Sequence, residues 1–144
     1  MQKQLIPKNL QRKTVSLQKP GIKQNNAETH CGLGHKGEDL AVQALENRGM
    51  QIIARNFRSS SGEIDIIALD KETIVFVEVK TWSVYSIENL QYSVNSRKQS
   101  RIIETAKYFL SVNRKYNEKA VRFDIIVVGK EAVTHLADAF MERV

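Results

Sequence analysis

The sequence predicts an α/β fold in which a mixed β-sheet is flanked by helices. Several runs of strand length are rich in β-branched residues, and two longer stretches repeat apolar residues at helical spacing. The order of these elements is helix, three strands, helix, strand. With 144 residues, 42% of them hydrophobic and 26% charged, the chain can form one domain with a core and has an ordinary globular composition.

The first helix is expected at residues 37–48, and Gly49 supplies its C-terminal stop. Its buried face is predicted from four apolar residues at helical spacing, which are Leu40, Ala41, Ala44 and Leu45. Residues 50–57 then predict a strand, and the Ser-Ser-Ser-Gly string at 59–62 predicts a turn.

Residues 63–69 and 73–80 are β-branched runs joined by a short polar turn, which predicts a hairpin. Both faces of these runs are apolar, so we expect central strands. A second helix is predicted at residues 95–116, with an apolar face made of Ile102, Ile103, Ala106, Phe109 and Leu110. Residues 121–128 predict a further strand, and residues 132–140 a short edge element.

Residues 1–31 predict a disordered basic N-terminal arm, and residues 32–144 predict a single domain. The arm is rich in Gln, Lys and Asn and has too few apolar residues to offset the entropy cost of ordering it. Residues 1–36 contain seven Lys or Arg and one acidic residue, so the formal net charge of +6 lies there. The glycines at 32, 34 and 37 match a dinucleotide-binding fingerprint, but no strand is expected before them, so we interpret them as a flexible entry to the first helix.

The predicted hairpin gathers charged side chains on one patch. With a symmetric loop, opposed residues have numbers that sum to 143, so Asp65 is expected opposite Glu78. By the same register, Glu63 is expected opposite Lys80. Because side chains alternate along a strand, all four share one face of the sheet.

Such a patch needs a compensating interaction. Two ionised carboxylates about 4 Å apart repel by roughly 4 kcal/mol at an effective dielectric of 20. A divalent cation bound by oxygen ligands would offset this, and Lys80 beside it could position a water or stabilise charge on a phosphate. The alternative is a structural ion-pair cluster, in which Glu63 pairs with Lys80 and one of Asp65 or Glu78 stays protonated or reaches solvent. Pattern and charge alone leave both interpretations open.

Two strings resemble the PD-(D/E)xK nuclease motif: Gly-Glu-Ile-Asp-Ile-Ile-Ala at 62–68 and Phe-Val-Glu-Val-Lys at 76–80. Three shorter strings extend the resemblance to the YraN family, bacterial proteins similar to Holliday-junction resolvases: Gly37-Glu38, Asn56-Phe57-Arg58 and Arg122-Phe123-Asp124. The resemblance covers about residues 34–140. It implies a restriction-endonuclease-like mixed β-sheet flanked by helices.

The resemblance also implies roles for individual residues. Asp65 and Glu78 would be metal ligands, and the carbonyl oxygen of Val79 a further ligand. Lys80 would be the catalytic lysine, which makes Asp65, Glu78 and Lys80 the expected catalytic residues. Glu38, on the first helix, would match an additional acidic metal ligand of resolvase-like members. The implied cofactor is Mg²⁺ or Mn²⁺.

Other charged residues have two interpretations each. On the exposed side of the second helix, Arg97, Lys98 and Arg101 form either a solvated face or a surface that neutralises phosphates, and we predict nucleic-acid binding. Arg122 and Asp124 share a strand face and either support the site or form an internal ion pair. Glu63 is a further supporting residue.

The predicted function is therefore that of a metal-dependent endonuclease acting on branched or structured DNA. The rival is a nucleic-acid-binding protein that keeps the fold without cutting, and a third interpretation is a protein-interaction module with a structural ion cluster. Trp82 and Tyr85, which follow Lys80, either stack on bases or pack the loop. Resolvase-like relatives act as dimers, so the resemblance is also compatible with a homodimer.

Cysteine content and hydropathy bear on the compartment. The single cysteine, Cys31, excludes an internal disulfide and fits a reducing environment. No apolar run is long enough to cross a bilayer. A cytoplasmic protein without membrane association is expected.

Overall fold

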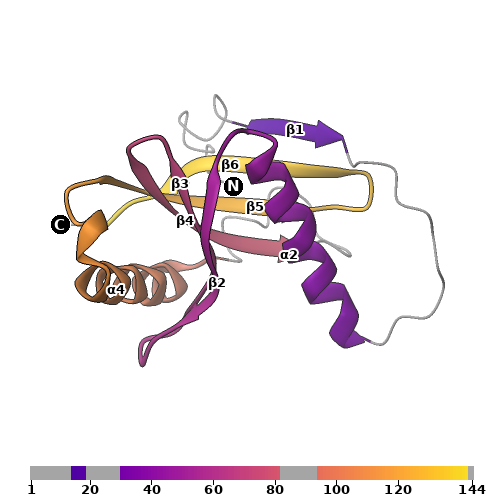
Figure 1. Cartoon of the computed structure of the whole chain (residues 1–144). Coiled ribbons are helices and arrows are strands. Elements are labelled where there is room, and N and C mark those ends of the chain that lie inside the picture. Colours follow the sequence, from indigo (N-terminus) through magenta and orange to yellow (C-terminus); the bar gives the residue numbers. More distant parts are fainter. Residues whose placement is uncertain (1–13, 19–29, 82–93, 143–144) are drawn as a thin grey trace, which may run out of the picture.

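In the computed structural model, residues 14–18, 30–81 and 94–142 are described. Within this part of the chain, six strands form one mixed sheet in the order β1-β6-β5-β4-β3-β2 (Figure 1). The β4–β5 pair is parallel, and the other neighbouring strands pair antiparallel. The elements are β1 (Thr14–Gln18), α2 (His30–Glu46), β2 (Gln51–Arg58), β3 (Glu63–Asp70), β4 (Thr73–Thr81), α4 (Ser96–Val112), the 3₁₀ turn η2 (Arg114–Tyr116), β5 (Ala120–Val128) and β6 (Ala132–Phe140). The predicted α/β class with a mixed sheet and flanking helices is confirmed.

Helix α2 begins at His30, seven residues before the predicted start at Gly37. The three glycines predicted to form a flexible entry therefore lie inside the helix, and that interpretation was wrong. The predicted stop is confirmed: Gly49 has a φ of +81°, a conformation that glycine adopts without a steric penalty. The N–H of Met50 closes the helix end by donating to the carbonyl of Leu45 at 3.1 Å.

The β3–β4 hairpin has the predicted register. Paired residues run from Asp70↔Thr73 to Ile66↔Val77, and each pair of numbers sums to 143. β3 and β4 are interior strands of the sheet, as their apolar faces predicted. The register places the two predicted acidic residues, Asp65 and Glu78, one step beyond the last pair.

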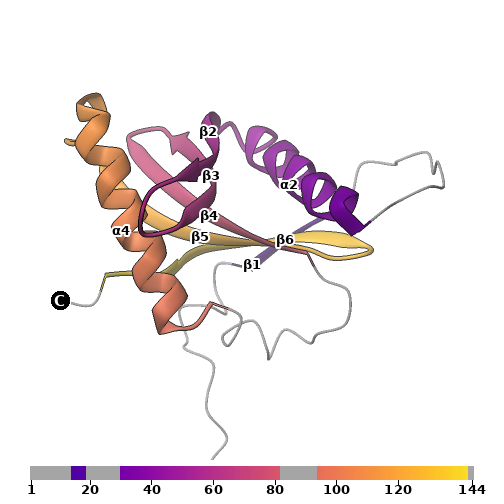
Figure 2. The same cartoon turned by 90° about the horizontal axis from the view of Figure 1, so that it is seen from below.

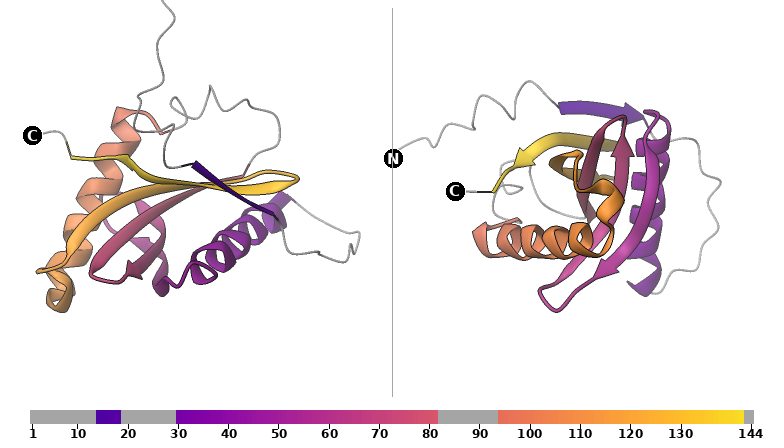
Figure 3. Two further views of the ribbon diagram at one scale, coloured as in Figure 1. Left: turned by 90° about the horizontal axis from the view of Figure 1, so that it is seen from above. Right: turned by 60° about the vertical axis from the view of Figure 1, so that its left-hand side comes forward.

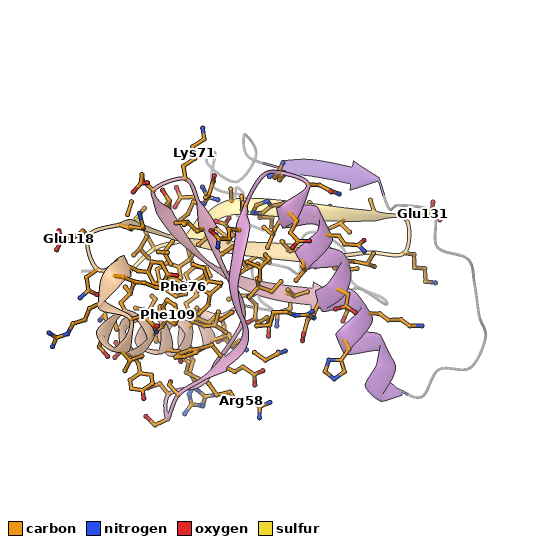
Figure 4. The ribbon with its side chains drawn as sticks, viewed as in Figure 1. Arg58, Lys71, Phe76, Phe109, Glu118 and Glu131 are labelled. Atoms are coloured by element: carbon orange, nitrogen blue, oxygen red, sulfur yellow. The ribbon has the colours of Figure 1, made fainter. Side chains whose placement is uncertain are left out.

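The core has two parts, one on each face of the sheet. Residues that alternate along β4 and β5 divide between them, so Phe76 packs beneath α4 whereas Val77 packs beneath α2. In the α4 half, Phe76 and Phe109 meet edge to face with ring centroids 5.9 Å apart (Figure 4). Figure 2 shows that the two helices also lie toward opposite ends of the twisted sheet.

Part of the predicted disordered arm is a strand. Thr14–Gln18 forms β1, which pairs with β6 from Thr14↔Leu136 to Gln18↔Ala132 (Figure 3). The prediction of disorder was wrong for these five residues because their apolar and polar residues alternate, as in a half-buried strand. The rest of the arm up to residue 29 lies outside the described residues. β6 is consequently not the short edge element predicted at residues 132–140, since it spans nine residues between β5 and β1.

Helix α4 starts where its cap predicts. The Asn95 side chain accepts a hydrogen bond from the N–H of Lys98 at 3.0 Å, and the helix ends at Val112, with a 3₁₀ turn in place of the predicted last turn. The predicted apolar face is confirmed, with Phe109 among its buried residues. Trp82 and Tyr85 lie outside the described residues. In the described part, neither helix is long and apolar enough to span a membrane.

Candidate metal and nucleic-acid site

The candidate site lies where β3 and β4 separate. Their main-chain pairing ends at Ile66↔Val77. Beyond this pair, the start of β3 remains paired with β2, and the end of β4 remains paired with β5 as far as Thr81↔Val128. The split interrupts the sheet at the two predicted acidic residues, so side chains from both faces of the sheet can approach them.

Asp65 bridges the split. Its Oδ2 accepts a hydrogen bond of 2.7 Å from the N–H of Val79, so a side chain replaces the next main-chain contact. Burial, followed by the negative charge of Glu78, raises the pKa of Asp65 from 3.8 to about 7. The charge of Glu38 raises this pKa further, while the Val79 hydrogen bond and the charge of Lys98 lower it. The protonation of Asp65 therefore depends on the acidic residue on α2 and on the lysine on α4 at once.

Glu78 is the most buried carboxylate of this group, with 4% of its surface exposed. One of its oxygens, Oε1, lies 2.9 Å from Nζ of Lys80 and 3.1 Å from Nζ of Lys98. The other oxygen, Oε2, is buried and has no hydrogen-bond partner within the described residues. Leaving a buried carboxylate oxygen without a hydrogen-bond partner is costly, so Oε2 keeps electron pairs that a cation or a hydrogen-bond donor could use.

Glu38 is carried to the site by a close helix–strand approach. A Cβ atom at Gly37 would overlap the Thr81 methyl group, so only glycine lets α2 approach the end of β4 this closely. The Glu38 carboxylate accepts a hydrogen bond of 3.1 Å from the Asn56 side chain, and Nη2 of Arg55 lies 3.7 Å from the same oxygen.

Asn56 is a positioning residue that the sequence reasoning did not assign. It has a φ of +50° inside β2, a conformation that Asn tolerates better than most residues. Its partner Glu38 comes from a different element, so strand periodicity alone gives no sign of the contact. The Asn-Phe-Arg string of the family resemblance was the available signal.

The residues present supply the oxygen ligands that a hard divalent cation prefers, but their side chains do not form a complete ligand set around one point. Asp65, Glu78 and Glu38 offer carboxylate oxygens, and Oε2 of Glu78, without a partner in the described part of the chain, is an oxygen of the kind that such a cation binds. In the described residues, however, no three His, Cys, Asp or Glu side chains are close enough to form a metal cluster. Val79 contributes its N–H to Asp65, and the role of its carbonyl oxygen remains a prediction.

The predicted basic residues on α4 separate into two kinds. Arg97 and Arg101 are exposed and have no ion-pair partner within the described residues. Lys98 is half-buried because its ammonium group lies against Glu78. The helix therefore contributes one cation to the acidic group and two to the surface beside it.

Glu63 does not pair with Lys80. Its carboxylate lies 2.9 Å from Nε of Arg58, across the β2–β3 pair, while Lys80 pairs with Glu78. The prediction failed because β3 and β4 separate before the register reaches these positions. The structural alternative that depended on a Glu63–Lys80 pair is thus wrong in that detail.

Arg122 and Asp124 form the internal ion pair that was one of their two interpretations. Both arginine nitrogens Nε and Nη2 bond the carboxylate of Asp124, which also lies 2.7 Å from Nε2 of His135. Arg122 reaches on to Asp70 at 3.1 Å, and the His135 ring meets Arg48 at 2.7 Å. This network lies on the α2 side of the sheet, whereas the Glu78–Lys98 contact lies on the α4 side.

The fold and the site together define a class. A mixed sheet with a helix on each face, split at a pair of acidic residues followed by a lysine, is an α/β fold consistent with restriction-endonuclease-like proteins. The profile described as "Uncharacterised protein family UPF0102" matches residues 37–128. The chain belongs to this family, which is the YraN family that the sequence strings indicated.

Relatives from several bacteria support the same membership. A UPF0102 protein of Treponema pallidum is 47% identical over 119 residues, which cover 78% of this chain and 94% of that protein. A UPF0102 protein of Clostridium perfringens is 45% identical over 114 residues, covering 75% and 93%. One of Persephonella marina is 44% identical over 107 residues, covering 74% and 91%. The family profile runs from Gly37 in α2 to Val128 at the end of β5.

Proposed function

We propose that this protein is a metal-dependent endonuclease that hydrolyses phosphodiester bonds in branched or otherwise structured DNA. The proposal is carried by a buried oxygen of Glu78 that has no hydrogen-bond partner among the residues that the structure describes. Burial and the charge of Glu78 also raise the pKa of Asp65 to about 7. Both carboxylates gain from a cation between them, and a cation also serves hydrolysis of a phosphodiester.

The residues would divide the work as follows. Asp65 and Glu78 would hold Mg²⁺ or Mn²⁺, with Glu38 approaching from α2, and the bound ion would supply Lewis-acid activation of the phosphate. Lys80, whose Nζ forms an ion pair with Glu78, would orient a water or stabilise charge on the phosphate. The exposed Arg97 and Arg101 would neutralise neighbouring phosphates. Action on DNA in a bacterial cell would put the protein in the cytoplasm.

The alternative is a nucleic-acid-binding protein that keeps this fold and does not cut. One observation favours it: Lys80 and Lys98 already neutralise Glu78, and an ion-paired carboxylate has less need of a metal. The basic residues on α4 serve both proposals equally. Metal binding and cleavage therefore distinguish them, and DNA binding alone does not.

The test compares the wild-type protein with Asp65→Asn and Glu78→Gln. Binding of Mn²⁺ is measured by calorimetry, and cleavage is measured on four-way junctions, forks and linear duplexes. The matched control is Asp39→Asn, which removes an exposed carboxylate one residue from Glu38 that pairs with Arg55 at 2.7 Å. We expect Mn²⁺ binding and cutting in the wild type and the control, and loss of both in the two site variants.

Each other outcome has a consequence. Protein that binds junction DNA but neither binds Mn²⁺ nor cuts would overturn the catalytic proposal and support the alternative. Cleavage that persists equally in Asp65→Asn would assign the activity to another site or a contaminant. If the protein binds none of these DNAs at low salt, both nucleic-acid proposals fail.

A further inference from the structure

The hairpin that joins β2 to β3 extends away from the split and past α4 (Figures 1 and 3). Its tip is the Ser59–Gly62 turn, closed by a 2.8 Å hydrogen bond from the N–H of Ser59 to the carbonyl of Gly62. Ser60 and Ser61 are exposed, and the side chain of Arg58 at the base of the turn is 76% exposed. The projecting element therefore presents hydroxyls, main chain and a guanidinium group, with no bulky apolar side chain at its tip.

The hairpin is held in a fixed position relative to the acidic group. Phe57, next to Arg58, packs edge to face on Phe109 of α4 with centroids 5.1 Å apart. The Ser59 hydroxyl lies 3.0 Å from the hydroxyl of Thr105, a fully buried residue of the same helix. Because α4 also carries Lys98 against Glu78, one helix connects the hairpin tip to the candidate site.

The charge of this surface suits a nucleic-acid backbone. Gly62 lies against Arg101, with 3.5 Å between the position of a Cβ on the glycine and Cβ of the arginine. Arg58 and the exposed Arg101 thus flank the tip. Arg58 pairs with Glu63 through Nε at 2.9 Å, which orients the guanidinium group while its terminal nitrogens are left for a phosphate.

We propose that the β2–β3 hairpin, with Arg58 as its anchor, is a second contact for a DNA duplex arm that leads away from the site. This inference rests on the proposed function and adds the part of the substrate that is bound. β3 begins at Glu63, so about three residues of extended chain, or about 10 Å, separate Asp65 from Gly62 at the edge of the turn. At about 3.4 Å per base pair, a duplex lying along β3 meets the turn about three base pairs from the reacting phosphate. The protein therefore recognises a duplex arm of at least that length.

The experiment measures binding of junctions whose arms range from about 2 to about 10 base pairs, in EDTA so that no cutting occurs. We expect the affinity of the wild-type protein to rise until the arm reaches about three base pairs and then to level off. The affinity of Arg58→Gln should not increase with arm length, and this variant should bind long-armed junctions about 3- to 10-fold more weakly than the wild type. Its affinity should also depend less steeply on salt concentration, by the equivalent of about one phosphate contact.

A matched charge control isolates the contribution of the guanidinium group. Lys71→Asn removes one positive charge at the β3–β4 turn, on the opposite side of the molecule from Arg58 (Figure 4), and suits the φ of +54° there. It should bind as the wild type does.

The outcomes separate this inference from the proposed function. If the wild type binds and cuts but Arg58→Gln keeps the full affinity, salt dependence and arm-length dependence, the hairpin inference is overturned and the proposed function stands. If Lys71→Asn lost as much affinity for junctions as Arg58→Gln does, the effect would come from the overall charge of the protein, and the inference would also be overturned. If the wild type binds no junction at low salt, the proposed function itself fails.

Discussion

The main-chain N–H of Val79 donates to the carboxylate of Asp65 over 2.7 Å, across strands that are no longer paired with each other. The contact explains how a sheet can open at its centre without leaving this N–H unsatisfied. It also fixes one oxygen, Oδ2, of a carboxylate whose pKa the charge of Glu78 raises. The same bond therefore stabilises the split and orients a candidate ligand.

Replacing Asp65 by asparagine should change how stability depends on pH. Folding raises the pKa of Asp65 from 3.8 to about 7, so between these values the native state holds a proton that the unfolded chain has released. Stability of the metal-free wild type should fall as the pH rises through this interval, and a side-chain amide, which does not titrate, cannot take part in that fall. We expect the free energy of unfolding of Asp65→Asn to fall by about 1 to 3 kcal/mol less than that of the wild type between pH 4 and pH 8, measured by urea unfolding.

The control for this pH effect is Asp39→Asn, which should keep the wild-type profile because Asp39 is exposed. The amide oxygen introduced by Asp65→Asn can still accept the hydrogen bond from the N–H of Val79, so the variant keeps this bridge between β3 and β4. The prediction would be contradicted if the free energy of unfolding had the same pH dependence in the wild type and in Asp65→Asn between pH 4 and pH 8.

Removing the ammonium group of Lys98 should strengthen metal binding. Lys98 lies 3.1 Å from the oxygen of Glu78 that Lys80 also contacts, so it competes with any cation for the same carboxylate. We expect Lys98→Met to bind Mn²⁺ about tenfold more tightly in calorimetry, or about 1.4 kcal/mol. The same variant should lose about 1 to 3 kcal/mol of stability without metal, because Glu78 keeps one fewer partner.

Lys107→Met is the matched control for Lys98→Met. Lys107 is an exposed lysine of the same helix and pairs with Glu104 at 3.1 Å. Its replacement should leave Mn²⁺ affinity unchanged. Weaker metal binding by Lys98→Met would mean that Lys98 orients Glu78 for the cation and does not compete with it.

Gly37→Ala should destabilise the protein although alanine favours helices. The added Cβ overlaps the methyl group of Thr81, and that conflict should outweigh the gain of about 0.5 to 1 kcal/mol expected for Gly→Ala in a helix. We expect a net loss of about 1 kcal/mol in thermal unfolding. Adding Thr81→Ala removes the methyl group and should restore at least the wild-type stability. A Gly37→Ala protein more stable than the wild type would show that Thr81 moves aside freely.

Local pattern in the sequence predicted the strands and the register, but not where the sheet divides. The sum rule for β3 and β4 depends only on the turn and the strand period, and it holds for every pair observed. The point at which β3 and β4 separate depends on how strongly β3 pairs with β2 and β4 pairs with β5. These pairings are not visible in the local pattern of either strand. The Lys98–Glu78 contact was missed for a related reason, since it joins a helix to a strand across the core.

The N-terminal arm shows the reverse limitation. Its composition predicted disorder, yet Thr14–Gln18 completes the sheet beside β6. Composition measures how much apolar surface a segment can bury by itself, and it does not register an open strand edge that offers main-chain hydrogen bonds. The main-chain hydrogen bonds that an open edge offers can therefore order a segment whose composition alone predicts disorder.

Asp124 is the centre of the buried network that includes Arg122 and His135. Burial alone would raise its pKa, but hydrogen bonds from His135 and Arg122 outweigh burial and hold the pKa below its usual range. Replacing this fully buried carboxylate by an amide in Asp124→Asn leaves Arg122 without its main counter-charge. We expect a loss of about 3 to 5 kcal/mol at pH 7 in urea unfolding.

The pH dependence and a control test the cause of this loss. Because folding lowers the pKa, the contribution of Asp124 is present above its unfolded value and is lost as the pH falls through the folded value. The difference between the wild type and Asp124→Asn should therefore narrow below about pH 4. Asp70→Asn removes the half-exposed partner of the same Arg122 and should cost about 1 kcal/mol or less. An Asp124→Asn protein that matched Asp70→Asn in stability would show that Arg122 and His135 find other partners.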